Sequence, residues 1–571
     1  MKRKKELIVV LTSLLVIVLS VSVAYFTTKI LGTGKEISVE SADLKVIFTS
    51  GSGTINGTNI EPGWTSGENT FTVKNESNGT YKYNIIIKDL VNTFTTNGFL
   101  VYKITSADGG YNMTDFEDVP KSKISKDTIL AYNISIDKGA THTYTVEYKY
   151  LESTDVDQSA DMGKTLTGKI FITKGTERPT LANQLLNDNP TIGTRTDFST
   201  PFTTNTANTL YKATENATDV YYFAGQDTES TPINNWVRFG KANKNGCTYN
   251  GSTVLYFNGS SILSVENESQ CLSSKICRLG DQYGVGETVT EDLCTSQDGY
   301  WTNQNAKWST STHNLYWRII RTNADGSIRL LYHGTSTTAT DAYIGKSKFN
   351  TNYNSPKYVG YMYGDTDATP EEARTNTNDS TIKAYIDNWY ANNMTSYTKY
   401  LSTTAVYCND RELASGASYS TTEQFYFKTY DRLVTNKVPT YDCTNIKDAF
   451  SVNNAEAKLT YPIALMTADE ISYAGGVVDQ DAPMWYYTNS SLESSTGTQF
   501  WWSLSPFSWF GLGAYSWFVF GSDSPGSLDS NNVDNWHGVR PAVSLKSCIK
   551  YSTGNGTSET PYEIVETSSG C

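Results

Sequence analysis

The sequence predicts a multidomain protein with an N-terminal transmembrane helix, an antiparallel β-sandwich and a larger α+β domain. Three observations lead to this prediction. The chain has 571 residues, which is more than a single hydrophobic core accommodates. A long uncharged run follows its basic first residues. Aromatic residues make up 13% of the chain and charged residues only 18%, which suits turn-rich β structure with ring-filled cores.

The N-terminal segment has the pattern of a membrane anchor. Residues 7–26 carry no charge, so a helix at about 1.5 Å per residue spans the roughly 30 Å hydrocarbon layer. The basic flank stays in the cytoplasm, so residues 1–6 form a cytoplasmic stub, residues 7–31 the transmembrane anchor, and the rest lies on the extracellular face. A cleaved signal peptide is the alternative, because Ser22, Val23 and Ala24 have the small-x-small pattern; cleavage after Ala24 secretes the protein.

The pattern of residues 36–175 predicts a β-sandwich. Tyr144, Val146, Tyr148 and Tyr150 alternate with threonine or charged residues, which is typical of a strand with one buried face. Several other short runs of this kind are separated by turns such as Asn78-Gly79. Many short strands without helical periodicity between them favour two packed antiparallel sheets.

The rest of the chain predicts a linker and an α+β domain. Residues 176–209 contain Pro179, Pro190 and Pro201 and are expected to be a linker. Within residues 210–546, a hairpin joins 316–321 to 328–332, and helices are expected after Ser380 and Thr467, whose side chains can cap them. A cysteine-bearing insertion occupies residues 240–308, and residues 547–571 are expected to form a C-terminal tail.

Eight cysteines, all beyond residue 240, predict disulfides in the exported part of the chain. The sequence has no Cys-x-x-Cys pattern, which argues against zinc. The spacing indicates a local group of four, a pair that closes one loop and a clasp at the C-terminal end. These are Cys247, Cys271, Cys277 and Cys294; Cys408 and Cys443; and Cys548 and Cys571.

The residue content argues against several classes of function. A net charge of −13 argues against nucleic-acid binding. The sequence contains no P-loop, His-Glu-x-x-His or Gly-x-Ser-x-Gly motif, and its four histidines have no metal spacing. The densest acidic group, Asp365, Asp367, Glu371 and Glu372, lacks the spacing of a calcium loop. We therefore expect no catalysis, no cofactor and no bound metal.

Residues 500–545 combine many rings with small polar groups. Rings offer large contact areas for few torsions, and small polar side chains adapt their hydrogen bonds to a partner. We expect Trp509 and Phe510 to be exposed, because Gly511 and Gly513 mark a loop around them. The neighbouring core strand is expected to hold Ala514, Phe518, Val519 and Gly521.

The N-terminal third resembles the export and sandwich modules of Gram-positive surface and biofilm-matrix proteins of the camelysin type. The resemblance rests on the anchor that ends Val23-Ala24-Tyr25-Phe26 and on the blocks Ile60-Glu61-Pro62-Gly63-Trp64 and Phe71-Thr72-Val73-Lys74-Asn75. It implies a surface stalk or a fibre-forming module.

A second resemblance covers most of residues 210–546. The block Trp501-Trp502-Ser503-Leu504-Ser505-Pro506 and the ending Gly538-Val539-Arg540-Pro541 resemble the C-type-lectin-like fold of variable proteins from diversity-generating retroelements and related Gram-positive surface proteins. This implies a ligand-binding display domain, with Arg540 holding the framework through hydrogen bonds. The implied binding positions are Phe507, Ser508, Trp509, Phe510, Leu512, Tyr515, Trp517, Phe520, Asp523, Asp529, Asn531, Asp534, Trp536 and His537. Calcium-dependent sugar binding is not implied, because the Glu-Pro-Asn and Trp-Asn-Asp triplets are absent.

Together these features predict a cell-surface protein for adhesion or recognition, held in the membrane by its N-terminal helix. Its expected partner is an extracellular protein or glycan. Two alternatives stay open: a structural matrix protein whose sandwich forms fibres, and an extracellular enzyme.

Overall fold

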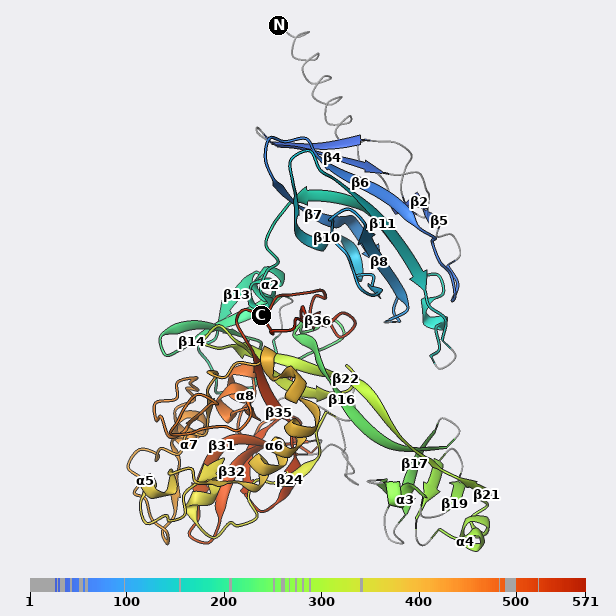
Figure 1. The fold of residues 1–571 in the computed structure, drawn as a ribbon. Helices are drawn as coiled ribbons and strands as arrows, with labels where there is room; N and C mark the ends of the chain where they lie inside the picture. The colour runs from blue at the N-terminus through green and yellow to red at the C-terminus, as the bar shows by residue number, and fades with distance from the viewer. Residues whose placement is uncertain are drawn as a thin grey trace, which may run out of the picture. The chain divides into compact units, whose positions relative to one another are not determined.

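The computed structural model describes the chain from residue 60 onward, except residues 97, 154–155, 205–207, 250–251, 258–261, 266–267, 273–274, 280–281, 287–288, 339–341, 482, 488–499 and 522. Before residue 60 it describes only the backbone of five short strands. The chain folds as two compact units, Met1–Pro179 and Thr180–Cys571 (Figure 1).

The first unit is built from antiparallel strands in three sheets. The six-stranded sheet has the order β3 (Glu36–Ser41), β4 (Leu44–Ser50), β6 (Asn69–Asn75), β11 (Thr141–Tyr150), β8 (Leu100–Ser106) and β9 (Glu117–Asp118). A three-stranded sheet places β7 (Tyr81–Asn92) between β10 (Ser122–Ile136) and β12 (Leu166–Lys174). The third sheet contains β1 (Phe26–Thr27), β2 (Lys29–Ile30) and β5 (Ile55–Asn56).

The two larger sheets of this unit share one hydrophobic core. Tyr144, Val146 and Tyr148 of β11 are buried, while the residues between them keep access to solvent. They belong to the same cluster as Ile85 and Ile87 of β7. The predicted β-sandwich is therefore confirmed, and the alternating pattern arises because successive side chains of a strand point to opposite faces.

The predicted membrane anchor falls mostly outside the described residues, which exclude residues 7–25. Its predicted end is wrong, because Phe26–Thr27 and Lys29–Ile30 are strands instead of helix. Within the described part of the chain, no helix is long and apolar enough to cross a membrane.

The second unit begins at Thr180, so the predicted linker is part of a folded domain. α2 (Leu181–Asp188) buries Leu181 and Leu185 in the main core. β13 (Thr191–Thr194) pairs in parallel with β14 (Thr209–Glu215). The linker prediction is therefore wrong for residues 180–204, because the prolines there mark the ends of short elements.

The predicted C-terminal tail is also built into the second unit. β36 (Tyr562–Glu563) pairs in parallel with β16 (Trp236–Tyr249), and the Tyr562 side chain is buried. The segment expected as a C-terminal tail, residues 547–571, is therefore part of the folded second unit.

A mixed sheet of 14 strands forms the larger layer of the second unit. Its main path runs through β13, β14, β15 (Thr218–Tyr222), β22 (Lys307–Thr322), β16, β17 (Ser252–Phe257), β20 (Gln282–Val285), β19 (Lys275–Leu279) and β21 (Tyr300–Asn305). Beside this path lie β18 (Ile262–Ser264), β23 (Ile328–Gly334), β30 (Ile463–Leu465), β35 (Pro541–Leu545) and β36. The predicted hairpin is β22–β23, with Trp317 opposite Tyr332.

A smaller sheet carries most of the predicted binding residues. Its order is β24 (Lys346–Lys348), β34 (Trp536–Gly538), β31 (Trp501–Trp509), β32 (Ala514–Val519) and β33 (Leu528–Asn532), with β28 (Phe425–Tyr426) also paired to β31. Two small sheets pair β25 (Met362–Tyr363) with β26 (Asn378–Asp379) and β27 (Tyr407–Cys408) with β29 (Ala449–Phe450).

The two predicted helices of this unit are confirmed. α6 (Thr381–Asn393) begins after Ser380, whose side chain accepts a hydrogen bond from the Lys383 amide. α8 (Ala468–Ala474) begins with a capping box formed by Thr467 and Glu470. The shorter helical segments in the unit are α3 (Glu268–Leu272), α4 (Glu291–Ser296), η2 (Pro356–Val359), α5 (Pro370–Ala373), η3 (Thr395–Tyr400), α7 (Lys428–Tyr430) and the π-helical turn η4 (Asp431–Thr435).

All three predicted cysteine groupings are present, and the local group of four forms two disulfides. The bonds are Cys247–Cys271, Cys277–Cys294, Cys408–Cys443 and Cys548–Cys571. The first two lie in the insertion, at the end of the β16–β22 ribbon (Figure 1). The insertion has a small hydrophobic core of its own, which includes Cys247 and Cys271. Four disulfides indicate that the protein works in an oxidising, extracellular environment.

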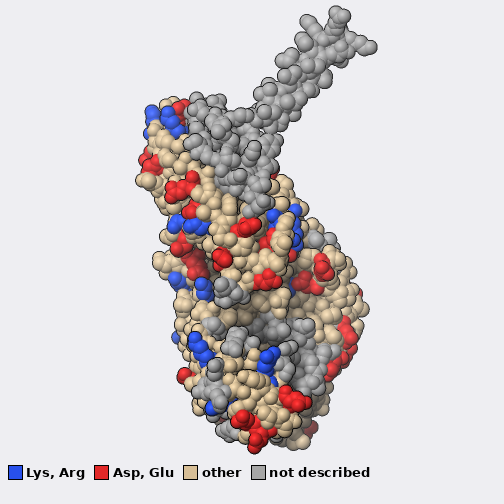
Figure 2. Space-filling model, turned by 90° about the vertical axis from the view of Figure 1, so that its right-hand side faces the viewer, with Lys and Arg blue, Asp and Glu red and all other residues tan. Residues whose placement is uncertain are grey.

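Uncharged residues dominate the surface drawn in Figure 2. On that face, small groups of Lys and Arg side chains lie among groups of Asp and Glu. This mixture agrees with a chain that is only 18% charged.

Candidate functional site

The predicted binding residues lie on neighbouring strands of the smaller sheet. β32 pairs with β33 in an antiparallel register that sets Tyr515 opposite Asn532. Because side chains alternate along a strand and paired residues of neighbouring strands share a face, Tyr515 and Trp517 point to one face, while Asp529 and Asn531, which pair with Phe518 and Ser516, point to the other. The predicted residues are therefore divided between two faces of the sheet instead of sharing one surface.

The expected exposure is wrong for four of these residues. Trp509 and Trp517 are 1% and 0% exposed, and Ser508 and His537 are buried as well. At its end β31 pairs with β28, which sets the buried Phe425 opposite Trp509. These rings fill the core because burying an indole removes a large apolar area from water.

The other predicted residues keep access to solvent. Leu512 and Trp536 are 85% and 62% exposed, and Asp523 is exposed too. The half-buried members are Phe507, Phe510, Tyr515, Phe520, Asp529, Asn531 and Asp534. The positions expected in the core, Ala514, Phe518, Val519 and Gly521, are buried.

Five half-buried rings from separate stretches of the chain lie together, and we call them the aromatic patch: Tyr426, Tyr430, Phe507, Phe510 and Tyr515. Tyr426 stacks on Tyr430 with ring centroids 4.0 Å apart, and it meets Phe507 and Phe510 edge-on at 5.6 and 5.8 Å. Phe510 meets Tyr515 edge-on at 4.8 Å. These are the distances of favourable ring pairs, so the five rings form one continuous surface.

No protein-family model, curated protein or solved structure matches this chain. What the aromatic patch can bind therefore follows from its own geometry. Tyr426 and Tyr430 were not among the residues predicted from the sequence. Their signal is the ring-dense run Phe425, Tyr426, Phe427 and Tyr430, which lies far upstream of Phe507 and gives no sign of contact with it.

Backbone hydrogen bonds hold Tyr426 from both sides. Tyr426 lies opposite Ser508 of β31, and its carbonyl accepts a bond of 2.9 Å from the Ala414 amide on the other side. The next amide, of Phe427, donates to the Phe507 carbonyl at 3.0 Å. α7 then carries Tyr430 and continues into η4, a kind of turn that is frequent at functional sites.

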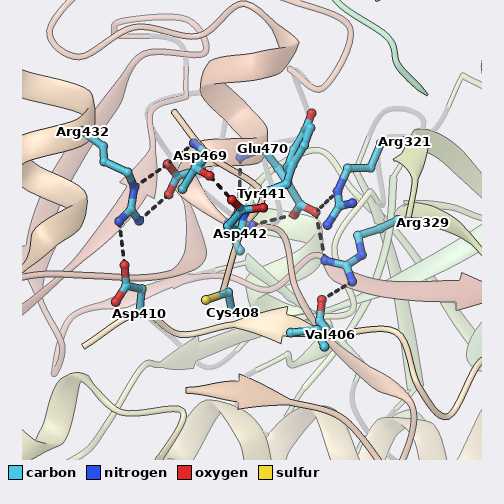
Figure 3. A pocket seen from close by; sticks show the side chains of 12 residues that line it. Arg321, Arg329, Val406, Cys408, Asp410, Arg432, Tyr441, Asp442, Asp469 and Glu470 are labelled. Carbon is cyan, nitrogen blue, oxygen red and sulfur yellow. Dashed lines mark hydrogen bonds and ion pairs between the residues drawn. The ribbon is translucent and has the colours of Figure 1, made fainter. Parts of the chain in front are cut away.

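An arginine in this turn ties the patch to the scaffold. Arg432 donates to both carboxylate oxygens of Asp469 at 2.8 and 2.9 Å, and to Asp410 at 2.6 Å (Figure 3). Burial opposes its charge, but the two carboxylates hold the pKa of Arg432 above its usual value. Because Arg432 follows Tyr430 by two residues, this fork determines where the Tyr430 end of the patch lies.

A small charged cavity lies beside this fork (Figure 3). Glu470 accepts bonds of 2.9 Å from both Arg321 and Arg329. Burial opposes the ionisation of Glu470, yet the two guanidinium groups keep its pKa below the usual value. The volume that the centre of a water molecule can occupy in this cavity is about 20 Å³, so the cavity has room for about one water.

The charged groups of this cavity stabilise the fold. Each of its guanidinium groups, on Arg321, Arg329 and Arg432, bonds a carboxylate of the chain. In the part of the chain that the structure describes, no group of three or more His, Cys, Asp or Glu could hold a metal ion. The ion pairs of Glu470 therefore fix α8, β22 and β23 to one another.

The polar members of the predicted set bond mainly within their own segment. Asp529 accepts from the Ser530 amide at 2.6 Å, and Asn531 accepts from the Asn532 amide at 2.8 Å. The Asn531 side chain also bonds His537 at 3.1 Å, and burial lowers the pKa of His537 to about 4. Much of the hydrogen-bonding capacity of this segment is thus used inside the chain.

Arg540 makes the contacts expected of a framework residue. It is buried and donates to the Tyr332 carbonyl at 3.1 and 3.2 Å and to the Tyr486 carbonyl. Its guanidinium also lies 5.0 Å from the centre of the Trp501 ring. Burial lowers the pKa of Arg540 to about 10. The residue joins β31, β23 and the segment before β31 into one framework.

Proposed function

We propose that this chain is an extracellular binding protein whose second unit captures a ligand on the aromatic patch. The observation that carries the proposal is the patch itself. Five rings joined by a chain of ring contacts stay half-buried at the surface, while ion pairs fix α8 to neighbouring elements of the same unit. Rigid rings lose little side-chain freedom on binding, which is why aromatic residues often dominate the energy of binding surfaces.

The proposal assigns the second unit to a C-type-lectin-like display domain. Residues 501–506 lie in β31, and residues 538–541 join β34 to β35, so both framework blocks contribute buried strands to one domain. The stretch between them brings Phe507, Phe510, Leu512 and Tyr515 to the surface. Variation at such positions between copies of the protein would change the ligand without disturbing the scaffold.

The proposal places the protein outside the cell, with the first unit as a stalk. Four disulfides support export. The attachment to the membrane is proposed from the uncharged run of residues 7–26, with cleavage after Ala24 as its alternative. No catalytic step is assigned, since the arginine and glutamate groups of the charged cavity bond one another.

Binding by the full-length chain to arrays of glycans and peptides tests the proposal. The double variant Tyr426→Ala with Phe510→Ala removes two rings of the patch, and Tyr300→Ala is the control because it removes a 70% exposed ring from the insertion. We expect the double variant to lose about tenfold or more in affinity, with little change in Tm, and the control to bind normally. Equal binding by wild type and double variant contradicts the proposal.

A further inference from the structure

We infer that the ligand of the aromatic patch is a polypeptide that presents apolar side chains next to lysine or arginine. This inference rests on the proposed function and narrows its ligand from a protein or glycan to one chemistry. Three features point to it: an aliphatic group beside the rings, the internal use of nearby polar groups, and an acidic rim.

The turn between β31 and β32 adds an aliphatic side chain to the ring surface. Leu512 is 85% exposed and lies two residues after Phe510. The Phe510 amide donates to the Gly513 carbonyl at 3.0 Å, which closes the turn. Gly511 has a φ of +75°, and a Cβ there would lie 2.7 Å from the Thr422 carbonyl oxygen, so the turn has this shape because glycine is present. Leu512 is therefore presented at a defined position, where an apolar partner can cover it.

Two polar groups of the ring surface and its border, the Tyr426 hydroxyl and the Asn532 side chain, are engaged within the chain. The Tyr426 hydroxyl accepts a hydrogen bond of 3.3 Å from the Gln424 side chain. The Asn532 side chain, opposite Tyr515, accepts from the Asp534 amide at 3.3 Å. A sugar needs several donors and acceptors for its hydroxyl groups, whereas an apolar side chain needs none. This surface therefore favours a polypeptide over a glycan.

Three carboxylates lie close to patch residues along the chain or next to a strand partner, and we call them the acidic rim: Glu423, Asp431 and Asp534. Glu423 is exposed, and Asp431 and Asp534 are half-buried. Within the described residues, none of the three forms an ion pair with a Lys, Arg or His. Asp431 follows Tyr430 directly, and Glu423 lies three residues before Tyr426. Asp534 lies two residues after Asn532, the strand partner of Tyr515.

Two cations close to Asp431 in the chain are paired with carboxylates. Lys428 bonds Glu412 at 2.5 Å, and Arg432 is held by Asp410 and Asp469. The rim therefore adds the negative charge of its three carboxylates near the patch. Such a charge attracts lysine and arginine of a partner and repels acidic partners, which sets specificity at the border of an apolar contact.

Three fluorescent peptides of equal length, added to the full-length chain, test this inference. One alternates leucine with lysine, one leucine with glutamate, and one glycine with lysine. We expect the leucine–lysine peptide to bind about tenfold or more tightly than either of the others, because it alone offers both apolar groups and positive charge. A preference for the leucine–glutamate peptide, or equal binding of the glycine–lysine peptide, overturns the inference.

Charge reversal of the rim gives the matched comparison. Glu423→Lys with Asp534→Lys is expected to reduce the preference for the leucine–lysine peptide by about tenfold, and binding should weaken as salt rises. Glu229→Lys is the control, since Glu229 is exposed and lies outside the rim. An equal loss in the control shows that overall charge, and not the rim, attracts the peptide, and it overturns the inference.

The double variant Tyr426→Ala with Phe510→Ala distinguishes a failure of the peptide inference from a failure of the proposed function. We expect it to bind the leucine–lysine peptide about tenfold more weakly than wild type. If a glycan binds instead and needs these two rings, the inference falls and the proposed function stands. If no peptide or glycan depends on the rings, both fall.

Discussion

Tyr430 stacks on Tyr426 with a centroid separation of 4.0 Å, although one belongs to a helical turn and the other to a strand. Both rings also meet Phe507 edge-on at 5.6 Å. Two residues after Tyr430, Arg432 binds Asp469 at the start of α8. The surface that we propose for binding is thus joined to the buried ion pairs of the domain, and changes in those ion pairs should reach it.

Loss of Arg432 should destabilise the second unit. Arg432→Met leaves the buried carboxylates of Asp410 and Asp469 without their cation, so we expect a loss of about 3–5 kcal/mol in the free energy of unfolding. Arg432→Lys keeps the charge but cannot bridge both carboxylates as the planar fork does, so it should restore only part of the stability and bind ligand more weakly. Denaturant unfolding and a binding titration measure the two effects. Unchanged unfolding of Arg432→Met would show that the fork is dispensable.

Glu470 should make stability depend on pH. Its folded-state pKa is lowered, so its contribution is complete above the pKa of an unfolded glutamate, about 4.3, and is lost as the pH falls through the folded value. We expect Glu470→Gln to be about 3–5 kcal/mol less stable than wild type at neutral pH, with a gap that narrows in acid. Urea unfolding at a series of pH values measures the gap. A gap of constant size from neutral pH to pH 3 would count against an ionised Glu470 in the folded protein.

The Cys408–Cys443 disulfide should stabilise the scaffold of the patch. It joins residues 35 positions apart and lines the charged cavity, and its loss through paired serine substitutions should lower the free energy of unfolding by about 3–4 kcal/mol. Because Asp410 and Glu412 follow Cys408 closely, affinity at the patch should fall as well. Replacing Cys277 and Cys294 in the insertion is the control, for which we expect unchanged binding at the patch. The prediction fails if both pairs affect binding equally.

Trp517 and Leu512 should behave in opposite ways. Trp517 is 0% exposed, so Trp517→Ala should cost about 3–5 kcal/mol of stability through the cavity that it leaves. Leu512 is 85% exposed, so Leu512→Ala should change stability by less than about 0.5 kcal/mol and weaken ligand binding instead. Calorimetry and binding measurements on the two variants distinguish the roles. A stable Trp517→Ala variant that no longer binds would return Trp517 to the binding surface.

Local patterns predicted much of the fold. The alternation of Tyr144, Val146 and Tyr148 predicted a strand, because one face of a sandwich sheet is buried and the other is wet. Thr467 and Glu470 predicted the start of α8, because the capping box satisfies amides at a helix end through neighbours in the chain. The prolines of residues 180–204 do not distinguish a flexible linker from a packed domain, since a proline ends an element whichever of the two follows.

The sequence by itself determined the two-unit β-rich architecture, the grouping of the cysteines and the location of a ring-dense segment between residues 500 and 545. Only the tertiary structure decided which of those rings are core and which are surface. Trp509 and Phe510 are neighbours in the chain, yet Trp509 lies in the core, opposite the buried Phe425 of β28, while Phe510 stays half-buried and meets Tyr426. The physical reason is that exposure depends on what packs against a strand from elsewhere in the chain, and local hydrophobicity carries no record of that partner.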